Sequence, residues 1–181
     1  MGIEDFGKTT RGHEQPYYRY LQTIGDSWSP FLWNANELNL WCIQIPRTIT
    51  IDRLFWVCDD IGTGGNWRMG IYRDSGVYTP FNQPLLAETA SIVARTYERN
   101  EGTIADLQLA PGIYWLAWIA SANQLNPFRI SPLNIVACGL ANPVSHVLNW
   151  AFGALPNPYP VASTSIGLYV PFMGVRVKTI P

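Results

Sequence analysis

Short runs rich in β-branched and aromatic residues, separated by clusters of Gly, Pro, Asn and Asp, make up the chain from about residue 38 onward. This texture is typical of an all-β sandwich or barrel, and no run offers a convincing long helix. We predict about eight strands, over residues 38–45, 48–57, 67–73, 85–95, 103–109, 113–120, 134–140 and 172–178. The predicted fold is an antiparallel β-sandwich, in which two sheets pack face to face.

The run of residues 113–120 is apolar on both of its faces. Alternation places Ile113, Trp115, Ala117 and Ile119 on one face and Tyr114, Leu116, Trp118 and Ala120 on the other. In an antiparallel sandwich the partner sheet covers one face of each strand, so this strand needs a second cover. We expect the cover to come from a neighbouring subunit or from the chain's own proline-rich segment 141–171.

The hydrophobic alternation of residues 48–57 changes phase within the run. If the strand is regular, its two early isoleucines share one face, while Leu54 and Trp56 point to the other. A β-bulge near Asp52 and Arg53 would bring all four side chains to one face. The sequence leaves both alternatives open.

Residues 1–30 are polar and glycine-rich and show no sustained hydrophobic period, so we expect an N-terminal arm followed by a sandwich domain over 31–181. The chain's first residues lack the apolar stretch of a secretory signal, which favours folding in the cytoplasm. The longest fully apolar run, 113–120, is far shorter than the roughly 20 residues of a membrane-spanning helix. We therefore expect no membrane insertion.

Charge is scarce along the chain. The 12 basic and 13 acidic residues nearly balance, so we expect no nucleic acid partner. Charged residues make up 14% of the chain, against about 25% in an average globular protein, while hydrophobic residues reach 48%. This depletion indicates a subunit interface, although a well-filled monomeric core is the alternative.

The three cysteines, Cys42, Cys58 and Cys138, are widely spaced and form no C-x-x-C pattern. They therefore suggest neither a disulfide framework nor a zinc site, and we interpret them as small buried hydrophobic residues.

Two stretches each contain part of a known catalytic or metal-binding pattern, but not the whole pattern. Residues 23–29, "TIGDSWS", resemble the nucleophile block of GDSL-type hydrolases, yet neither His13 nor His146 has an aspartate three residues before it. We therefore interpret Asp26 and Ser27 as loop or capping residues and expect no catalytic residue and no enzyme.

Asp59 and Asp60 precede the glycine-rich "IGTGGN" and could donate oxygens to Ca²⁺. An exposed turn explains them equally well, and the spacing of a known calcium loop is missing. We expect no metal and no cofactor.

Aromatic residues in predicted loops are the main candidates for recognition, because they can anchor protein interfaces or stack on sugars. We favour interfaces, since no cluster of loop carboxylates or amides accompanies them. The interface candidates are Tyr17, Tyr18, Tyr20, Trp28 and Trp33 for docking, with Trp115 and Trp118 for packing. The alternative candidates, for stacking on a glycan beside a groove, are Trp150 and Tyr159.

Several stretches occur together in a familiar order: "IPRTITIDRLFWV", "WRMGIYRD", "PLLAETASI", "LAPGIYWLAWIAS", "FGALPNPYP" and "VPFMGVRVK". Their order and spacing over roughly residues 38–178 resemble the jelly-roll-like β-sandwich domains of tailed-bacteriophage virion proteins, especially the C-terminal parts of fibre proteins and small exterior head proteins. The resemblance implies a sandwich of jelly-roll type and a non-enzymatic virion component that usually works as a homotrimer.

The chain lacks the heptads or collagen-like repeats of a fibre stem, and an arm of about 30 residues is too short for a shaft. We therefore expect a capsid decoration or cement protein that binds the major capsid protein on the head exterior. The alternative is a tail-fibre or receptor-binding tip that contacts tail proteins, or a carbohydrate-binding module that binds a cell-surface glycan.

Overall fold

The computed structural model of the 181-residue chain describes residues 19–22, 28–30, 34–61, 64–95, 99–123, 125–130, 145–161, 170–171 and 173–181. For residues 19–22, 28–30, 59–61, 125–130, 145 and 170–171 it describes the backbone alone.

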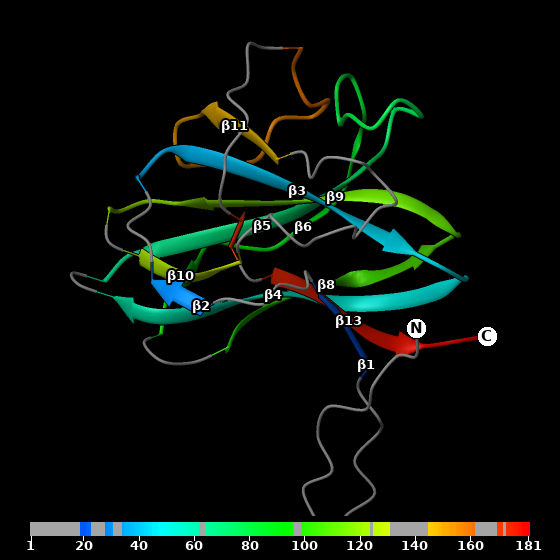
Figure 1. Ribbon diagram of the computed structural model, residues 1–181, viewed down its shortest axis with the longest axis horizontal. Coiled ribbons are helices and arrows are strands. Elements are labelled where there is room, and N and C mark those ends of the chain that lie inside the picture. The colour runs from blue at the N-terminus through cyan, green and yellow to red at the C-terminus, as the bar shows by residue number, and fades with distance from the viewer. Residues whose placement is uncertain are drawn as a thin grey trace, which may run out of the picture.

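Two antiparallel sheets packed face to face form the molecule (Figure 1). The first sheet has the order β1–β13–β4–β10–β12, with β8 beside β4 and β2 beside β10. Its strands are β1 Arg19–Gln22, β2 Trp28–Pro30, β4 Ile49–Ile61, β8 Arg99–Leu109, β10 Leu125–Ile130, β12 Val170–Pro171 and β13 Met173–Thr179.

The second sheet has the order β11–β3–β9–β5–β6, with β7 also paired to β5. Its strands are β3 Glu37–Ile45, β5 Asn66–Arg73, β6 Leu85–Glu88, β7 Ile92–Val93, β9 Gly112–Ala120 and β11 Ser145–Asn149. The predicted antiparallel β-sandwich is therefore confirmed, and no helix occurs within the described ranges. Its assignment to the jelly-roll type stays a prediction.

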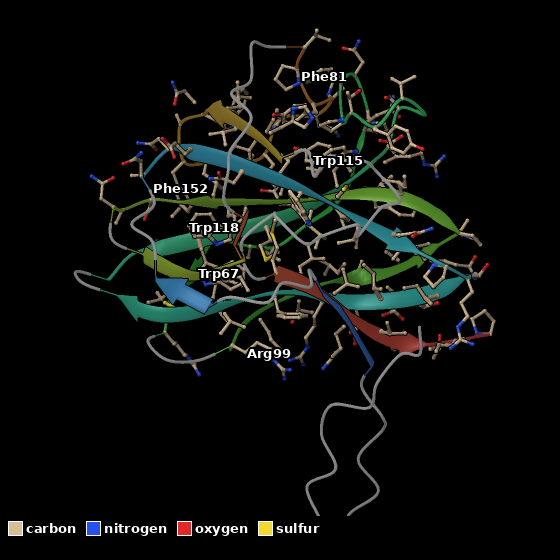
Figure 2. All side chains as sticks on the ribbon, viewed as in Figure 1. Trp67, Phe81, Arg99, Trp115, Trp118 and Phe152 are labelled. Atoms are coloured by element: carbon tan, nitrogen blue, oxygen red, sulfur yellow. The ribbon has the colours of Figure 1, made fainter. Side chains whose placement is uncertain are left out.

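The core between the sheets is rich in tryptophan. Trp56 of β4 meets Trp67 of β5 and Trp118 of β9 edge to face, with ring centroids 6.0 and 5.4 Å apart. All three side chains are fully buried, and Figure 2 shows Trp67 and Trp118 between the two sheets. Edge-to-face contact brings the positive rim of one ring against the negative face of the next, which stabilises such a cluster beyond its area burial.

A β-bulge in β4 decides between the two alternatives for the hydrophobic alternation of residues 48–57. Along β13, Val177 pairs with Ile51 and Arg176 pairs with Arg53, so Asp52 is the extra residue on β4. Both isoleucines that precede the bulge, and Leu54 and Trp56 after it, are buried in the same core. The bulge alternative is therefore confirmed, because one added residue restores the alternation that the sequence breaks.

The predicted strand over residues 85–95 is wrong, because these residues form the two short strands β6 and β7. Thr89 separates them: its Oγ1 accepts a hydrogen bond from the N–H of Met69 at 3.0 Å. A side-chain oxygen thus takes the place of a backbone acceptor, which interrupts the ladder with β5.

The other predicted strands have these outcomes. The strand predicted for 103–109 begins earlier, at Arg99, and the strand predicted for 134–140 lies outside the described residues, as does Cys138. Cys42 and Cys58 are buried, as expected.

Two strands lie within the predicted arm. Residues 19–22 form β1, which pairs with β13, and residues 28–30 form β2, which pairs with β10. These residues therefore belong to the first sheet, while the division into an arm over 1–30 and a sandwich domain over 31–181 stays a prediction. The sequence hides them because each strand is only a few residues long and has no room for a detectable period.

Candidate functional site

The outer face of the second sheet is covered by the chain itself. Loop residues 74–84 and 150–161, here called the cover layer, lie over it on the side away from the first sheet (Figure 1). Leu155 and Tyr159 of this layer are buried against Trp115, Ala117 and Ile119 of β9. The doubly apolar strand is thus buried on both faces, as predicted, and of the two predicted sources of cover it is the chain's own segment that supplies it.

Backbone hydrogen bonds hold the two loops of the cover layer together. The N–H of Asn82 donates to the carbonyl of Tyr159 at 2.8 Å, and the N–H of Tyr159 donates to the carbonyl of Gln83 at 3.0 Å. The hydroxyl of Tyr72, on β5, donates to the carbonyl of Pro156 at 2.8 Å. The layer is therefore fixed to the sheet by specific bonds as well as by apolar contact.

Asn36, before β3, fixes the start of the second loop. Its carbonyl accepts from the N–H of Trp150 at 2.9 Å, and its Oδ1 accepts from the N–H of Phe152 at 2.8 Å. Glu88 of β6, paired with Arg68, accepts a bond from the N–H of Leu155 at 3.3 Å.

Aromatic rings fill the space beneath the cover layer. Tyr72 meets Tyr159 edge to face at 5.5 Å, and His146 of β11 lies 5.2 Å from Phe81 and 5.0 Å from Trp115. Burial raises the pKa of both tyrosines above its ordinary value and lowers the pKa of His146. All three groups are therefore neutral packing elements near pH 7.

Residues 74–79, here called the tip loop, are ordered by one carboxylate. Oδ2 of Asp74 accepts hydrogen bonds from the N–H groups of Gly76 at 2.7 Å and Tyr78 at 3.3 Å. Its Oδ1 accepts from the indole Nε1 of Trp115 at 2.8 Å. Ser75 and Thr79 close the loop through a backbone bond of 2.9 Å and a hydroxyl contact of 2.8 Å.

The tip loop exposes apolar side chains. Val77 is 71% exposed and Tyr78 is 45% exposed. Tyr78 has a φ of 59°, in the left-handed region that non-glycine residues rarely occupy. Because backbone strain persists where the surroundings enforce it and clusters at binding and catalytic sites, this loop is the leading candidate for contact with a partner.

The cover layer contains no Asp, Glu, Lys or Arg after Asp74. Residues 75–87 have none, and none occurs between Arg129 and Arg176, which includes all of residues 150–161. The polar groups that this layer offers are therefore hydroxyls and amides.

The outer face of the first sheet, by contrast, is lined with ion pairs. Those found on β4, β8 and β13 are Arg53 with Glu101, Arg99 with Glu101, Arg176 with Asp52, and Lys178 with Asp106. Figure 2 shows Arg99 on the side of this sheet that points away from the second sheet. Ion pairs are thus concentrated on the outer face of the first sheet, whereas the cover layer has no charged side chain after Asp74. The Arg68–Glu88 pair of β5 and β6 lies beside the cover layer, where Glu88 accepts from Leu155.

The aromatic residues predicted as sites have mixed outcomes. Trp115 and Trp118 are fully buried, so they pack within the chain and present no ring to a partner. The prediction that Tyr159 is an exposed stacking residue is wrong, because it has 0% exposure beneath its own loop. Trp150 is half-buried, packs against the same cluster, and donates from Nε1 to the carbonyl of Ala154 at 3.0 Å.

Several other candidates are outside what the structure describes. Tyr17, Tyr18 and Trp33 fall there, as do His13, Asp26 and Ser27. For Tyr20, Trp28, Asp59 and Asp60 the backbone alone is described, in β1, β2 and β4. Where side chains are described, no group of three or more His, Cys, Asp or Glu is placed to hold a metal ion.

Sequence reasoning missed Val77 and the carboxylate that orders its loop. The signal lay in "DSG" at residues 74–76, because an aspartate two residues before a glycine favours a turn in which the carboxylate bonds to the backbone. The fold was needed to show that Trp115 lies beneath that aspartate.

Comparison with known proteins gives no identification: no family model matches the chain, and no curated protein is significantly similar to it. Within the described residues there is also no helix with the length and apolar character needed to span a bilayer.

Proposed function

We propose that this protein is a non-enzymatic structural component of a tailed-phage virion, a capsid decoration or cement protein on the head exterior, and that it docks through its cover layer. The observation that carries the proposal is the absence of charged side chains from the cover layer after Asp74, against the ion pairs on the outer face of the first sheet. It adds to the resemblance carried by the sequence stretches at residues 38–178.

This contrast in charge favours the cover layer as the docking face for a physical reason. Removing charged groups from water costs free energy that contacts must recover, so interface centres are depleted in charge and enriched in aromatic residues. The ion pairs of β4, β8 and β13 remain solvated if the first sheet faces outward. The cover layer, with no charge after Asp74 and with Val77 exposed, can be buried without that cost.

A decoration protein also needs a rigid body, because many weak contacts add up over a lattice only when their geometry is fixed. The tryptophan-filled core and the bonded cover layer supply that rigidity. A homotrimer stays part of the proposal. Strand β9 needs no cover from a partner, since Leu155 and Tyr159 cover it, so the burial of this strand does not support the homotrimer.

Labelling of particles tests this function. The purified protein, tagged with gold at its C-terminus, is added to tailed-phage particles that carry this chain and have been depleted of it by mild denaturant. We expect label spread over the head. Label confined to the tail end would contradict the decoration role and favour the receptor-binding alternative, and no label on either part would contradict a virion role.

A further inference from the structure

The tip loop is the part of the cover layer that combines a restricted backbone with exposed apolar side chains. From this combination we propose that the loop is the anchor of the docking face, with Val77 and Tyr78 entering an uncharged, apolar pocket on a coat-protein subunit. The inference rests on the proposed function and names the contact that would carry it.

The backbone of the loop is held before any partner arrives. Asp74 fixes the N–H groups of Gly76 and Tyr78, and the bonds between Ser75 and Thr79 close the ring. Preorganisation reduces the entropy lost on binding, so such a loop can contribute more affinity than a flexible one of the same composition. Tyr78 has a left-handed backbone, with φ 59°, which non-glycine residues rarely adopt, and its side chain is 45% exposed.

The exposed groups define the chemistry of the partner. Val77 is the more exposed of the two at 71%, and an isopropyl group gains little from a polyhydroxyl sugar but much from an apolar pocket. The loop lacks charge after Asp74, whose two oxygens already accept bonds from within the protein. Arg73, the exposed last residue of β5, places one charge beside the tip loop. An apolar loop with a charged residue at its edge matches the apolar centre and polar rim of protein interfaces.

A matched pair of valines tests the anchor. Val77→Ser removes an apolar group at the tip loop, and Val93→Ser removes one of similar exposure, 67%, from β7 outside the cover layer. Tyr78→Asn removes the ring but keeps a residue that tolerates the left-handed conformation, so this variant should fold. Binding of each purified variant to the same depleted particles is measured by co-sedimentation, after circular dichroism has confirmed the fold.

The wild-type chain and Val93→Ser are expected to bind alike. Val77→Ser and Tyr78→Asn are expected to bind at least about tenfold more weakly, as for anchor residues in interface centres. If the wild type binds and both tip variants bind as well as it does, the anchor is wrong while the virion role stands. If the wild type does not bind, both proposals fail.

A glycan array with the wild-type chain and Tyr78→Asn distinguishes the remaining class of partner. We expect no specific signal. Specific binding of a saccharide that Tyr78→Asn abolishes would overturn the protein-pocket proposal and assign the tip loop to sugar recognition.

Discussion

The carboxylate of Asp74 accepts a hydrogen bond from the indole Nε1 of Trp115, 2.8 Å away, and this bond connects an exposed loop to the buried strand β9. The residue that is central to the core therefore also positions the surface from which Val77 projects. Packing and the proposed docking contact are linked through one side chain.

Replacing Asp74 with Asn should loosen the tip loop without unfolding the protein. An amide keeps one acceptor oxygen, so it cannot serve both Trp115 and the N–H groups of Gly76 and Tyr78. We expect the free energy of unfolding to fall by about 1–2 kcal/mol. Hydrogen exchange should accelerate at the amides of Gly76 and Tyr78, and unchanged protection there would contradict the role given to the carboxylate.

Gly102 on β8 should not tolerate a side chain. A Cβ at this position would lie 2.8 Å from Cβ of Thr89, between β6 and β7, and 3.0 Å from Cδ1 of Ile92 on β7. We expect Gly102→Ala to destabilise the fold by about 1–3 kcal/mol, because the sheets cannot move apart locally. Gly153→Ala is the matched control, since the nearest atom to its Cβ is 3.8 Å away, and urea unfolding compares the two.

A compensating change should identify the clash. Thr89→Ser removes one methyl group facing Gly102 and keeps the hydroxyl that accepts from Met69. The double variant should therefore recover part of the stability lost in Gly102→Ala. Strict additivity of the two single changes would contradict a clash between the methyl group of Thr89 and a Cβ at position 102.

Stability should fall on mild acidification because of His146. Its pKa is lowered by burial beneath Phe81 and beside Trp115, while in the unfolded chain it is near 6.5. As the pH falls below 6.5, the unfolded chain binds a proton that the folded chain does not, so the free energy of unfolding decreases. Urea unfolding at pH 7.5 and pH 5.5 should show this loss in the wild type and a smaller one in His146→Gln, and equal losses would contradict the assignment.

The bulge in β4 predicts how the protein responds to deletions within this strand. Asp52 is the extra residue, and it forms a two-point pair with Arg176 that lowers its pKa. Deleting Asp52 should leave a regular strand with Ile51 and Leu54 still facing the core, so the protein should fold with reduced stability. Deleting Asp52 and Arg53 together should reverse the facing of Leu54 onward and abolish cooperative thermal unfolding.

The alternation in residues 113–120 was enough to predict a strand buried on both faces, because side chains alternate across any strand. The same rule could not identify Asp52 as the extra residue of a bulge. In the sequence a bulge appears only as a break in the alternation, and the pairing with β13 is needed to locate it. Thr89 was missed for a related reason. Its hydroxyl replaces a backbone acceptor, which depends on where Met69 lies across the sheet.

The candidate site was less predictable than the fold. The sequence predicts that an aromatic residue in a loop, such as Tyr159, is exposed, yet the loop folds back over the sheet and buries it. The concentration of ion pairs on the outer face of the first sheet is likewise a property of the assembled sheet: Asp106 and Lys178 are far apart in the chain and meet across the first sheet.

In the proposed docking mode the cover layer, and not the charged first sheet, meets the partner. Hydrogen–deuterium exchange of the protein, free and bound to particles, tests it most directly. We expect slower exchange in residues 74–84 and 150–161 on binding, with no change in 99–109 and 173–179. Protection of the latter two segments, with the cover layer unchanged, would contradict it.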